Sequence, residues 1–289
     1  MAKRSVTDLI DAELNGQVHS HIFRKVPTQT TVSGFWFDLS LSPGIPKPQY
    51  YTGTELTATP LYRSTNGSVN HGSPVTPYTK HLRQLSAMAS VATPLPMRLK
   101  LEDNLLFYPL IDQSLDAEVQ TMDNTVTLPR YASGDGVQIK AVVTNPHATG
   151  GTGFSFVCSY TNSLGVSGRT TNPVTLATQF VSGTIISSGP AQLMLSGPYL
   201  PLQSGDSGVR SIESVTMTGS EVGLMALVLV KPIADAEIQR IDAPFFIDYW
   251  QSEMSAPVIE DDACLNFICL PLGTVAGNVF FGDIKTVWL

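Results

Sequence analysis

The sequence has few charged residues, only three cysteines and no long hydrophobic run. Charged residues make up 14% of its 289 residues, against about 25% in an average globular chain. A helical bundle rich in Glu, Lys and Ala is therefore not expected, and neither is a doubly wound nucleotide-binding enzyme. Because the formal net charge is −7, direct binding to nucleic acid through a basic surface is also disfavoured.

The longest apolar run is too short to cross a membrane. It covers residues 222–230 (VGLMALVLV), whereas a spanning helix needs about 20 residues. The basic pair at Lys3 and Arg4 is not followed by the apolar segment of a secretory signal. We therefore expect no membrane partner and synthesis in the cytosol.

The cysteines fit neither a disulfide framework nor a metal site. Cys158, Cys264 and Cys269 are odd in number, and the spacing of the last two matches no zinc or redox motif. The prediction is three free, mostly buried thiols, made in a reducing compartment.

What the sequence does contain is a series of short alternating segments separated by turns. With 43% hydrophobic residues, 23 Gly and 20 Pro, it has enough apolar side chains for a core and many turn formers. Such strands, spaced by Gly, Pro and Asn turns, predict an all-β fold with a β-sandwich or jelly-roll-like body. Strands are expected at residues 17–26, 30–41, 97–110, 118–128, 137–143, 154–161, 174–180, 183–187, 192–195, 212–218, 222–231, 265–270 and 278–289.

A short helix is expected at the N-terminus. Thr7 is a candidate N-cap, and Asn15 followed by glycine is a stop signal. Val6, Ile10 and Leu14 form one apolar stripe. An isolated helix of this length is marginal in water, so the stripe is expected to dock on its own domain or on a neighbouring subunit.

One further helix is predicted over residues 78–90. Thr76 can cap it and Pro77 occupies the tolerated first position. The apolar residues recur at helical spacing; they are Tyr78, Leu82, Leu85 and Met88 or Ala89.

Charge is unevenly distributed along the chain. Residues 141–205 contain a single charged residue, Arg169, whereas residues 211–289 carry eleven acidic against three basic side chains. The uncharged middle is the expected packed or inter-subunit region. We divide the chain into an N-terminal arm, residues 1–26, and a β-rich body, residues 27–289, with the option of two packed β subdomains meeting near residue 130.

Four motifs suggest chemistry, and each has a simpler explanation. Residues 205–208 (GDSG) match the letters around the nucleophile of chymotrypsin-like proteases, but the glycine that normally follows is Val209. Residues 150–153 (GGTG) precede a strand instead of the helix that a phosphate loop needs. His19 and His21 could share a face of a strand, but no third metal ligand is apparent. Residues 260–262 (EDD) could help to bind calcium, but a solvated acidic loop explains them more simply. No catalytic residue, cofactor or metal site is expected.

In overall style the chain resembles structural proteins of tailed-bacteriophage virions. The resemblance is strongest to auxiliary head proteins that cement or decorate the capsid, and it rests on low charge, a helical N-terminal arm and sandwich spacing, not on a diagnostic motif. It implies location in the virion, assembly in the host bacterial cytoplasm, and a non-enzymatic role. The implied partners are the major capsid protein or other virion proteins, and further copies of the chain in a symmetric oligomer such as a trimer.

The N-terminal arm is the predicted inter-subunit element. Its candidate contact residues are Arg4, Leu9, Ile10, Leu14, Phe23 and Arg24. A second reading is a tail protein that binds a receptor or glycan, for which the Tyr50–Tyr51 pair is the best feature. A hydrolase using Ser207 is a third.

Overall fold

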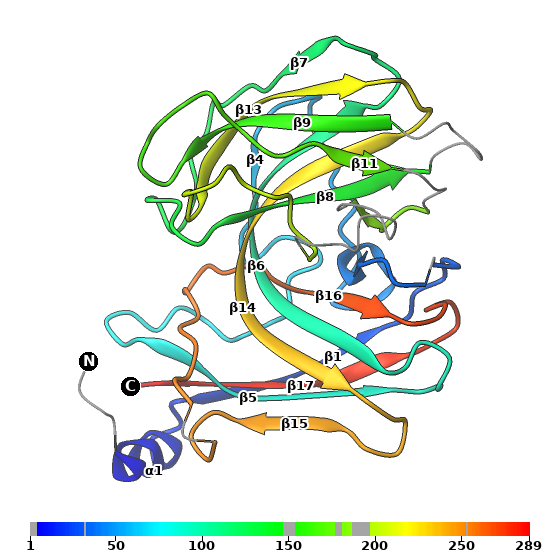
Figure 1. The fold of residues 1–289 in the computed structure, drawn as a ribbon. Coiled ribbons are helices and arrows are strands. Elements are labelled where there is room, and N and C mark those ends of the chain that lie inside the picture. Colours follow the sequence, from blue (N-terminus) through cyan, green and yellow to red (C-terminus); the bar gives the residue numbers. More distant parts are fainter. Residues whose placement is uncertain (1–4, 32, 147–153, 177–180, 187–196, 253) are drawn as a thin grey trace.

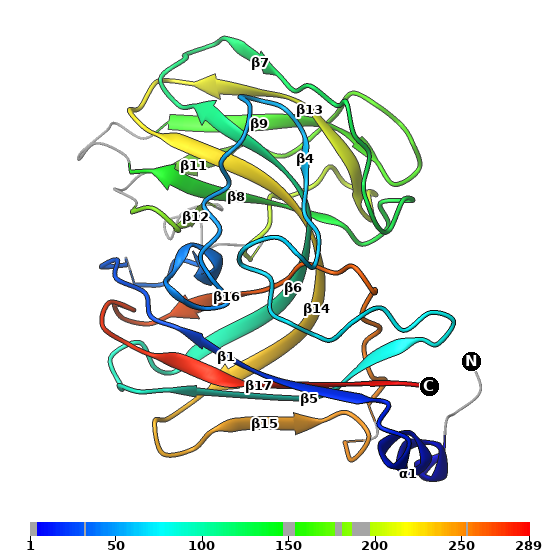
Figure 2. The same ribbon diagram turned by 180° about the vertical axis from the view of Figure 1, so that it is seen from behind.

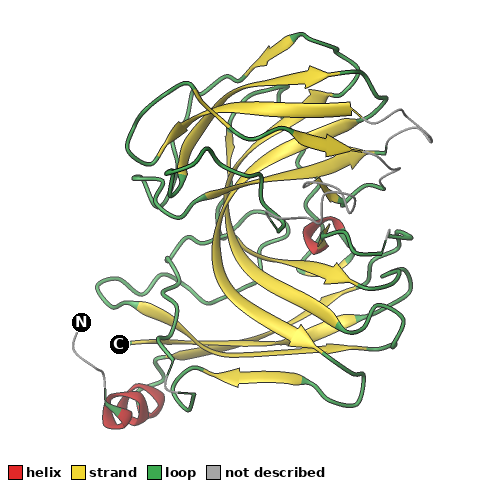
Figure 3. Ribbon diagram, viewed as in Figure 1, coloured by secondary structure: helices red, strands yellow, loops and turns green. Residues whose placement is uncertain are grey.

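The structure, a computed structural model, describes all residues except 1–4, 32, 147–153, 177–180, 187–196 and 253. It consists mostly of antiparallel strands, with one α-helix in the described part, α1 (Val6–Leu14), and a short 3-10 helix, η1 (Leu39–Leu41). Figure 3 shows how little of the chain is helical. The all-β prediction is confirmed. No helix among the described residues is long and apolar enough to span a membrane.

A central sheet runs through the whole molecule (Figure 1). Its strand order is β12-β8-β14-β6-β16-β2, with β4 also paired to β6. The bounds are β2 Phe37–Asp38, β4 Thr59–Pro60, β6 Met97–Asp112, β8 Gln138–Asn145, β12 Ile185–Ile186, β14 Leu224–Ile238 and β16 Leu265–Pro271. The two longest strands, β6 and β14, pair along nearly their full length and curve from one end of the molecule to the other.

Two smaller sheets pack against this central sheet and create two sandwiches. The upper sheet has the order β10-β9-β13-β7, with β11 paired to β9; its strands are β7 Val119–Thr121, β9 Phe154–Asn162, β10 Arg169–Thr170, β11 Val174–Leu176 and β13 Val209–Thr218. The lower sheet has the order β15-β5-β17-β1-β3; its strands are β1 Val18–Lys25, β3 Gly44–Ile45, β5 Lys80–Ala89, β15 Phe245–Asp248 and β17 Phe280–Trp288. Figure 2 shows both sandwiches from behind.

Each sandwich has its own apolar core. The upper core includes Tyr108, Ile139 and Val215, and the lower core includes Phe23 and Leu99. Because β6 and β14 supply side chains to both cores, the sandwiches share strands and do not meet at one point in the sequence. Residue 130 lies in the connection between β7 and β8.

The helix predicted over residues 78–90 is wrong, because this segment is strand β5, paired between β17 and β15. Leu82 and Leu85 are both buried although they are three residues apart. A register shift opposite Lys285 and Thr286 inserts an extra residue, Arg83, between them. Such a bulge changes which face the following side chains occupy. Leu82 and Leu85 can therefore both face the core, although their spacing of three residues resembles that of a helix.

The other segments follow the alternation of the sequence to different degrees. Several strands expected from residue 97 onwards exist with ends shifted by at most three residues, as β6, β8, β9, β13, β16 and β17, and β14 continues seven residues beyond its expected end. The segment 30–41 forms only β2 and η1, and 118–128 shortens to β7. The strand expected at 192–195 lies outside the described residues. The three cysteines are free and buried, as predicted.

Candidate interaction surface

Helix α1 begins and ends at defined caps. Ser5, not the predicted Thr7, is the N-cap: its hydroxyl accepts a hydrogen bond from the Asp8 amide, and the Asp8 carboxylate accepts one from the Ser5 amide. This reciprocal capping box satisfies two amides that a helix start otherwise leaves unpaired. The helix ends at Leu14, with Asn15 as its C-cap, as the sequence predicted.

The helix docks on its own chain through a different stripe from the predicted one. Leu9 and Ala12 are buried in a small cluster with Val287 of β17, against which Trp250 and Leu289 pack. Leu9 and Ala12 lie three residues apart and so share a face of the helix. Docking is therefore intramolecular, and it uses only one side of α1.

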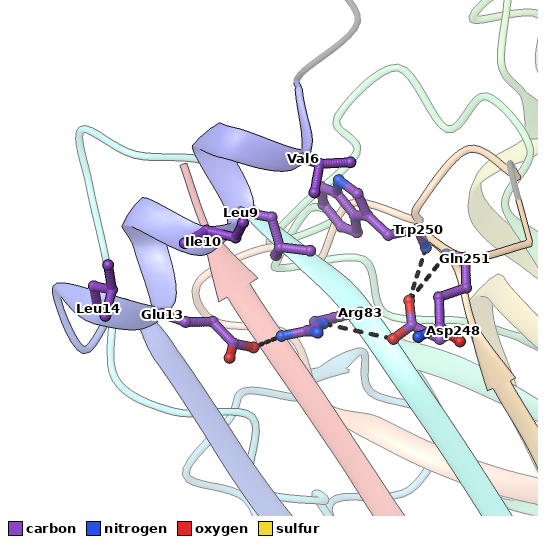
Figure 4. Close-up of a pocket in the computed structure, with 9 residues that line it drawn as sticks. All are labelled: Val6, Leu9, Ile10, Glu13, Leu14, Arg83, Asp248, Trp250 and Gln251. Atoms are coloured by element: carbon purple, nitrogen blue, oxygen red, sulfur yellow. Dashed lines mark hydrogen bonds and ion pairs between the residues drawn. The ribbon is translucent and has the colours of Figure 1, made fainter.

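Ion pairs fix the helix to the lower sheet (Figure 4). The Glu13 carboxylate pairs with Arg83 of β5 and lies 2.8 Å from Nζ of Lys285 on β17. Nε of Arg83 is 3.7 Å from Oδ2 of Asp248, whose Oδ1 accepts a 2.9 Å hydrogen bond from the Trp250 amide. This chain of charges links α1, β5 and the turn after β15.

The predicted apolar stripe of α1 faces solvent. Val6, Ile10 and Leu14 are 68%, 53% and 80% exposed. They line a hollow of about 450 Å³ that also includes Trp250 and Gln251, and Figure 4 shows the stripe residues and Trp250 around it. Exposed apolar side chains that line a hollow form a surface that can bind an apolar partner.

Further apolar side chains are exposed on the outer face of the lower sheet. Ile22, Phe246 and Phe281 are 58%, 58% and 36% exposed. Directly paired residues share a face of a sheet; Ile22 is opposite Asp283 and Phe246 is opposite Ser86. The Ser86 hydroxyl donates to the Asp283 carboxylate, so these side chains stand on one side of the sheet.

Helix α1 covers one end of that same side, because its Glu13 pairs with Lys285, two residues beyond Asp283 on β17. We call the whole surface the α1 face. It consists of Val6, Ile10, Leu14, Ile22, Phe246 and Phe281.

The predicted arm residues divide between this face and the core. Ile10 and Leu14 are exposed, whereas Leu9 is buried. Phe23 is buried too, with its ring 4.3 Å from that of Phe267 in the lower core, because residues 18–25 form β1, a strand inside the lower sheet. Phe23 is therefore unavailable to a neighbouring subunit.

The basic part of the arm also divides. Arg24 is exposed, and Arg4 lies outside the described residues. Lys25 is buried and donates hydrogen bonds to the carbonyls of Ser42, at 3.2 Å, and Pro46, at 2.8 Å. Burial lowers the pKa of Lys25 to about 8. Only Arg24 of this pair is thus placed to meet a partner.

The GDSG segment is tied into the upper sandwich by polar contacts. The Ser207 hydroxyl donates to Asp135 at 2.8 Å and contacts the Ser163 hydroxyl at 3.0 Å; neither partner is an imidazole, which a serine nucleophile needs. Asp206 accepts hydrogen bonds from the side chains of Tyr160, Asn162 and Arg169. These contacts pin the loop to β9 and β10.

The candidate metal ligands have other contacts. The rings of His19 and His21 stack with centroids 6.1 Å apart. Asp261 accepts hydrogen bonds from the amides of Val75 and Thr76 and pairs with Lys80, so its carboxylate closes a loop. Within the described parts of the chain, no three His, Cys, Asp or Glu side chains are grouped as a metal site.

The two tyrosines proposed for glycan binding differ in environment. Tyr50 is 55% exposed, but Tyr51 is buried. Its hydroxyl donates a 2.7 Å hydrogen bond to Asp38, and its ring lies 5.4 Å from that of Phe107. Tyr51 therefore belongs to a buried polar network in the central sheet, which the sequence analysis did not identify.

Comparison with known proteins leaves the chain without an assigned family. No family model matches it, and no curated protein does. Among solved structures, the VP2 subviral particle of infectious bursal disease virus aligns with 94% of this chain and 80% of its own, at 9% identity and a TM-score of 0.20. Structures of the Gt and Gx strains of that virus give TM-scores of 0.17 and 0.18 at 8% and 9% identity, again over 94% of this chain and 82% and 80% of theirs. TM-scores this low do not indicate a shared fold.

Proposed function

We propose that this chain is a structural protein of a virus particle, which binds the major capsid protein and stabilises or decorates the head as a symmetric homo-oligomer. In this proposal it is assembled in the cytoplasm of a bacterial host and performs no catalysis. The observation that carries the proposal is the α1 face, where six large apolar side chains remain exposed on one side of the lower sandwich.

The α1 face is suited to contact with a repeating partner. Exposed apolar side chains gathered on one side of a folded domain are typical of an interaction site. In a particle many copies bind together, so the contact made by each copy can be weak. Few charges on the rest of the chain also fit a protein that is held in an assembly and does not rely on charge for solubility.

A triple variant tests this function without disturbing the core. Val6→Ser, Ile10→Ser and Leu14→Ser together remove the exposed stripe and leave Leu9 and Ala12 docked. We expect the variant to fold and to lose most of its incorporation into particles, measured as occupancy by electron microscopy. This variant is cleaner than deleting residues 1–26, because such a deletion would also remove β1 from the lower sheet.

A matched control lies on the upper sandwich and its loops. Val119, Leu164 and Val222 are 63%, 80% and 62% exposed, so changing all three to Ser removes similar apolar surface elsewhere. We expect this control to reach normal occupancy. Normal occupancy of the α1 variant, or an equal loss in the control, would contradict the assignment of the contact to the α1 face.

A further inference from the structure

The middle of the central sheet contains a lysine between two carboxylates. Nζ of Lys140, on β8, lies 2.9 Å from Oδ2 of Asp38 on β2 and 2.9 Å from Oε2 of Glu102 on β6. All three side chains are fully buried. An amine held against a carboxyl group in a buried site has the two reactants of an amide bond in contact.

The contacts around Asp38 resemble those of a site that stabilises a tetrahedral intermediate. Its Oδ1 accepts hydrogen bonds from the Ser40 amide and from Nδ2 of Asn266, each at 2.8 Å. Its Oδ2, the oxygen beside Lys140, accepts one from the Tyr51 hydroxyl at 2.7 Å. Two fixed donors on one oxygen can hold the negative charge that develops when an amine adds to the carboxyl carbon.

Glu102 is placed to move the proton. Burial raises its pKa, and its other oxygen, Oε1, accepts a 2.7 Å hydrogen bond from the Tyr199 hydroxyl. Burial alone would lower the pKa of Lys140, but the charges of Asp38 and Glu102 outweigh it and raise that pKa. The resting lysine is therefore an ammonium, and it becomes a nucleophile only after it transfers a proton to a neighbouring carboxylate.

We propose that Lys140 and Asp38 form an intramolecular isopeptide bond, with Glu102 as the proton carrier. Glu102 takes one proton from the Lys140 ammonium and passes it to Oδ2 of Asp38, and Nζ then attacks Cγ of the neutral carboxyl group. The new C–N bond forms as the bond from Cγ to Oδ2 breaks. Glu102 carries a second nitrogen proton to the departing oxygen, which leaves as water. An ammonium and a carboxylate thus become one amide and one water molecule, and Glu102 is unchanged.

This bond would join the two ends of the strand order β8-β14-β6-β16-β2, with Lys140 on the first strand and Asp38 on the last. The sheet curves so that these ends approach each other. Phe37 of β2 forms a bridge with Thr184, which directly precedes β12, and β12 pairs with β8; the Asp38 amide donates to the Gly183 carbonyl. The bond would therefore replace a buried ion pair by a covalent link between the two ends of a nearly closed sheet.

Mass spectrometry of the purified full chain, denatured, tests the proposal. We expect an intact mass one water molecule below that of the sequence, after allowance for removal of the first methionine. A tryptic digest should contain one branched peptide that joins the segment around Asp38 to the segment around Lys140, with no cleavage after Lys140. A folded wild-type chain with its full mass after prolonged incubation would overturn the proposal.

A competing loss of water has a different signature. Asp135 precedes Gly136, and such a pair can lose water by closing a ring on its own backbone. In that case trypsin would still cleave after Lys140 and no branched peptide would form, which also overturns the proposal.

Three variants separate chemistry from packing. Lys140→Arg and Glu102→Gln should keep the full mass, because the first lacks a nucleophilic amine and the second lacks the proton carrier. Asp38→Asn should form the same bond by releasing ammonia, and so end at the mass of the linked wild type. A merely structural role for the three residues predicts full mass in every variant and in the wild type.

Discussion

The middle of the central sheet and the end of the molecule that carries α1 distribute polar and apolar groups in opposite ways. In the middle, Lys140, Asp38 and Glu102 are fully buried, whereas at the α1 end Leu14 and Val6 are mostly exposed. The buried charges are satisfied by one another and by neighbouring hydroxyl and amide groups. The exposed apolar side chains have no such cover within the described part of the chain. The first region is complete within one chain, and the second is suited to a partner.

The largest effect is expected from breaking the buried charge cluster. Lys140→Met leaves Asp38 and Glu102 buried without their cation and also removes the amine of the proposed isopeptide bond. Removing one partner of a buried ion pair alone costs about 3–5 kcal/mol. We expect the free energy of unfolding, measured by urea denaturation, to fall by that amount or more. Lys100→Met is the matched control, because Lys100 pairs with Asp235 at the surface, where an ion pair contributes about 0–1 kcal/mol. Equal losses in the two variants would remove the distinction between buried and surface charge.

A buried histidine, His71, extends the comparison to the pH dependence of stability. His71 is fully buried; its Nε2 is 2.9 Å from the Ala263 carbonyl, and Nδ1 is 3.3 Å from Nζ of Lys80. Lys80 can only donate, so Nδ1 accepts and Nε2–H donates, as in neutral histidine. Burial first, and the charge of Lys80 second, lower the pKa of His71 to about 4.

Because the folded state resists protonating His71, stability is lost as pH falls. Between the ordinary pKa of about 6.5 and the folded value of about 4, the unfolded chain binds a proton that the folded chain does not. We expect the free energy of unfolding to fall by up to about 3 kcal/mol across this range and this contribution to level off below it. In His71→Gln, denaturation curves should lack this component. A slope that is the same in variant and wild type would assign the pH dependence to other groups.

The sequence predicted local strands well because alternation is a local signal. The segment that became β9 alternates between faces and is bounded by turns, so its position followed from its own residues. The prediction for residues 80–89 was wrong because the bulge at Arg83 is set by pairing with Lys285 and Thr286 of β17, which lie far away in the sequence. Helical spacing and a bulged strand cannot be distinguished without that pairing.

The charge cluster was unpredictable for a related reason. Lys140 lies between Ile139 and the apolar run at residues 141–143, which indicates a buried cation that needs an anion. The residues next to Lys140 in the sequence do not show which anions pair with it. Asp38 and Glu102 come close to Lys140 only when the central sheet has formed. The exposed stripe of α1 was visible in the sequence, but which of two apolar faces would dock depended on where Val287 and Trp250 lie.

The smallest expected changes in unfolding free energy distinguish the docked side of α1 from its exposed side. Leu9→Ala removes a buried side chain from the cluster with Val287 and should cost about 2 kcal/mol of unfolding free energy. Leu14→Ala makes the same chemical change on the same helix at a position that is 80% exposed, and should stay within about 0.5 kcal/mol.

The order of these two effects should reverse when binding is measured. Leu14→Ala removes apolar surface that the partner is proposed to cover, so it should weaken incorporation into particles while leaving thermal unfolding unchanged. Leu9→Ala should reduce thermal stability and affect incorporation only to the extent that the helix detaches. If Leu14→Ala destabilised the isolated chain as much as Leu9→Ala, the exposed stripe would already be covered within the protein, and the α1 face would not be open to a partner.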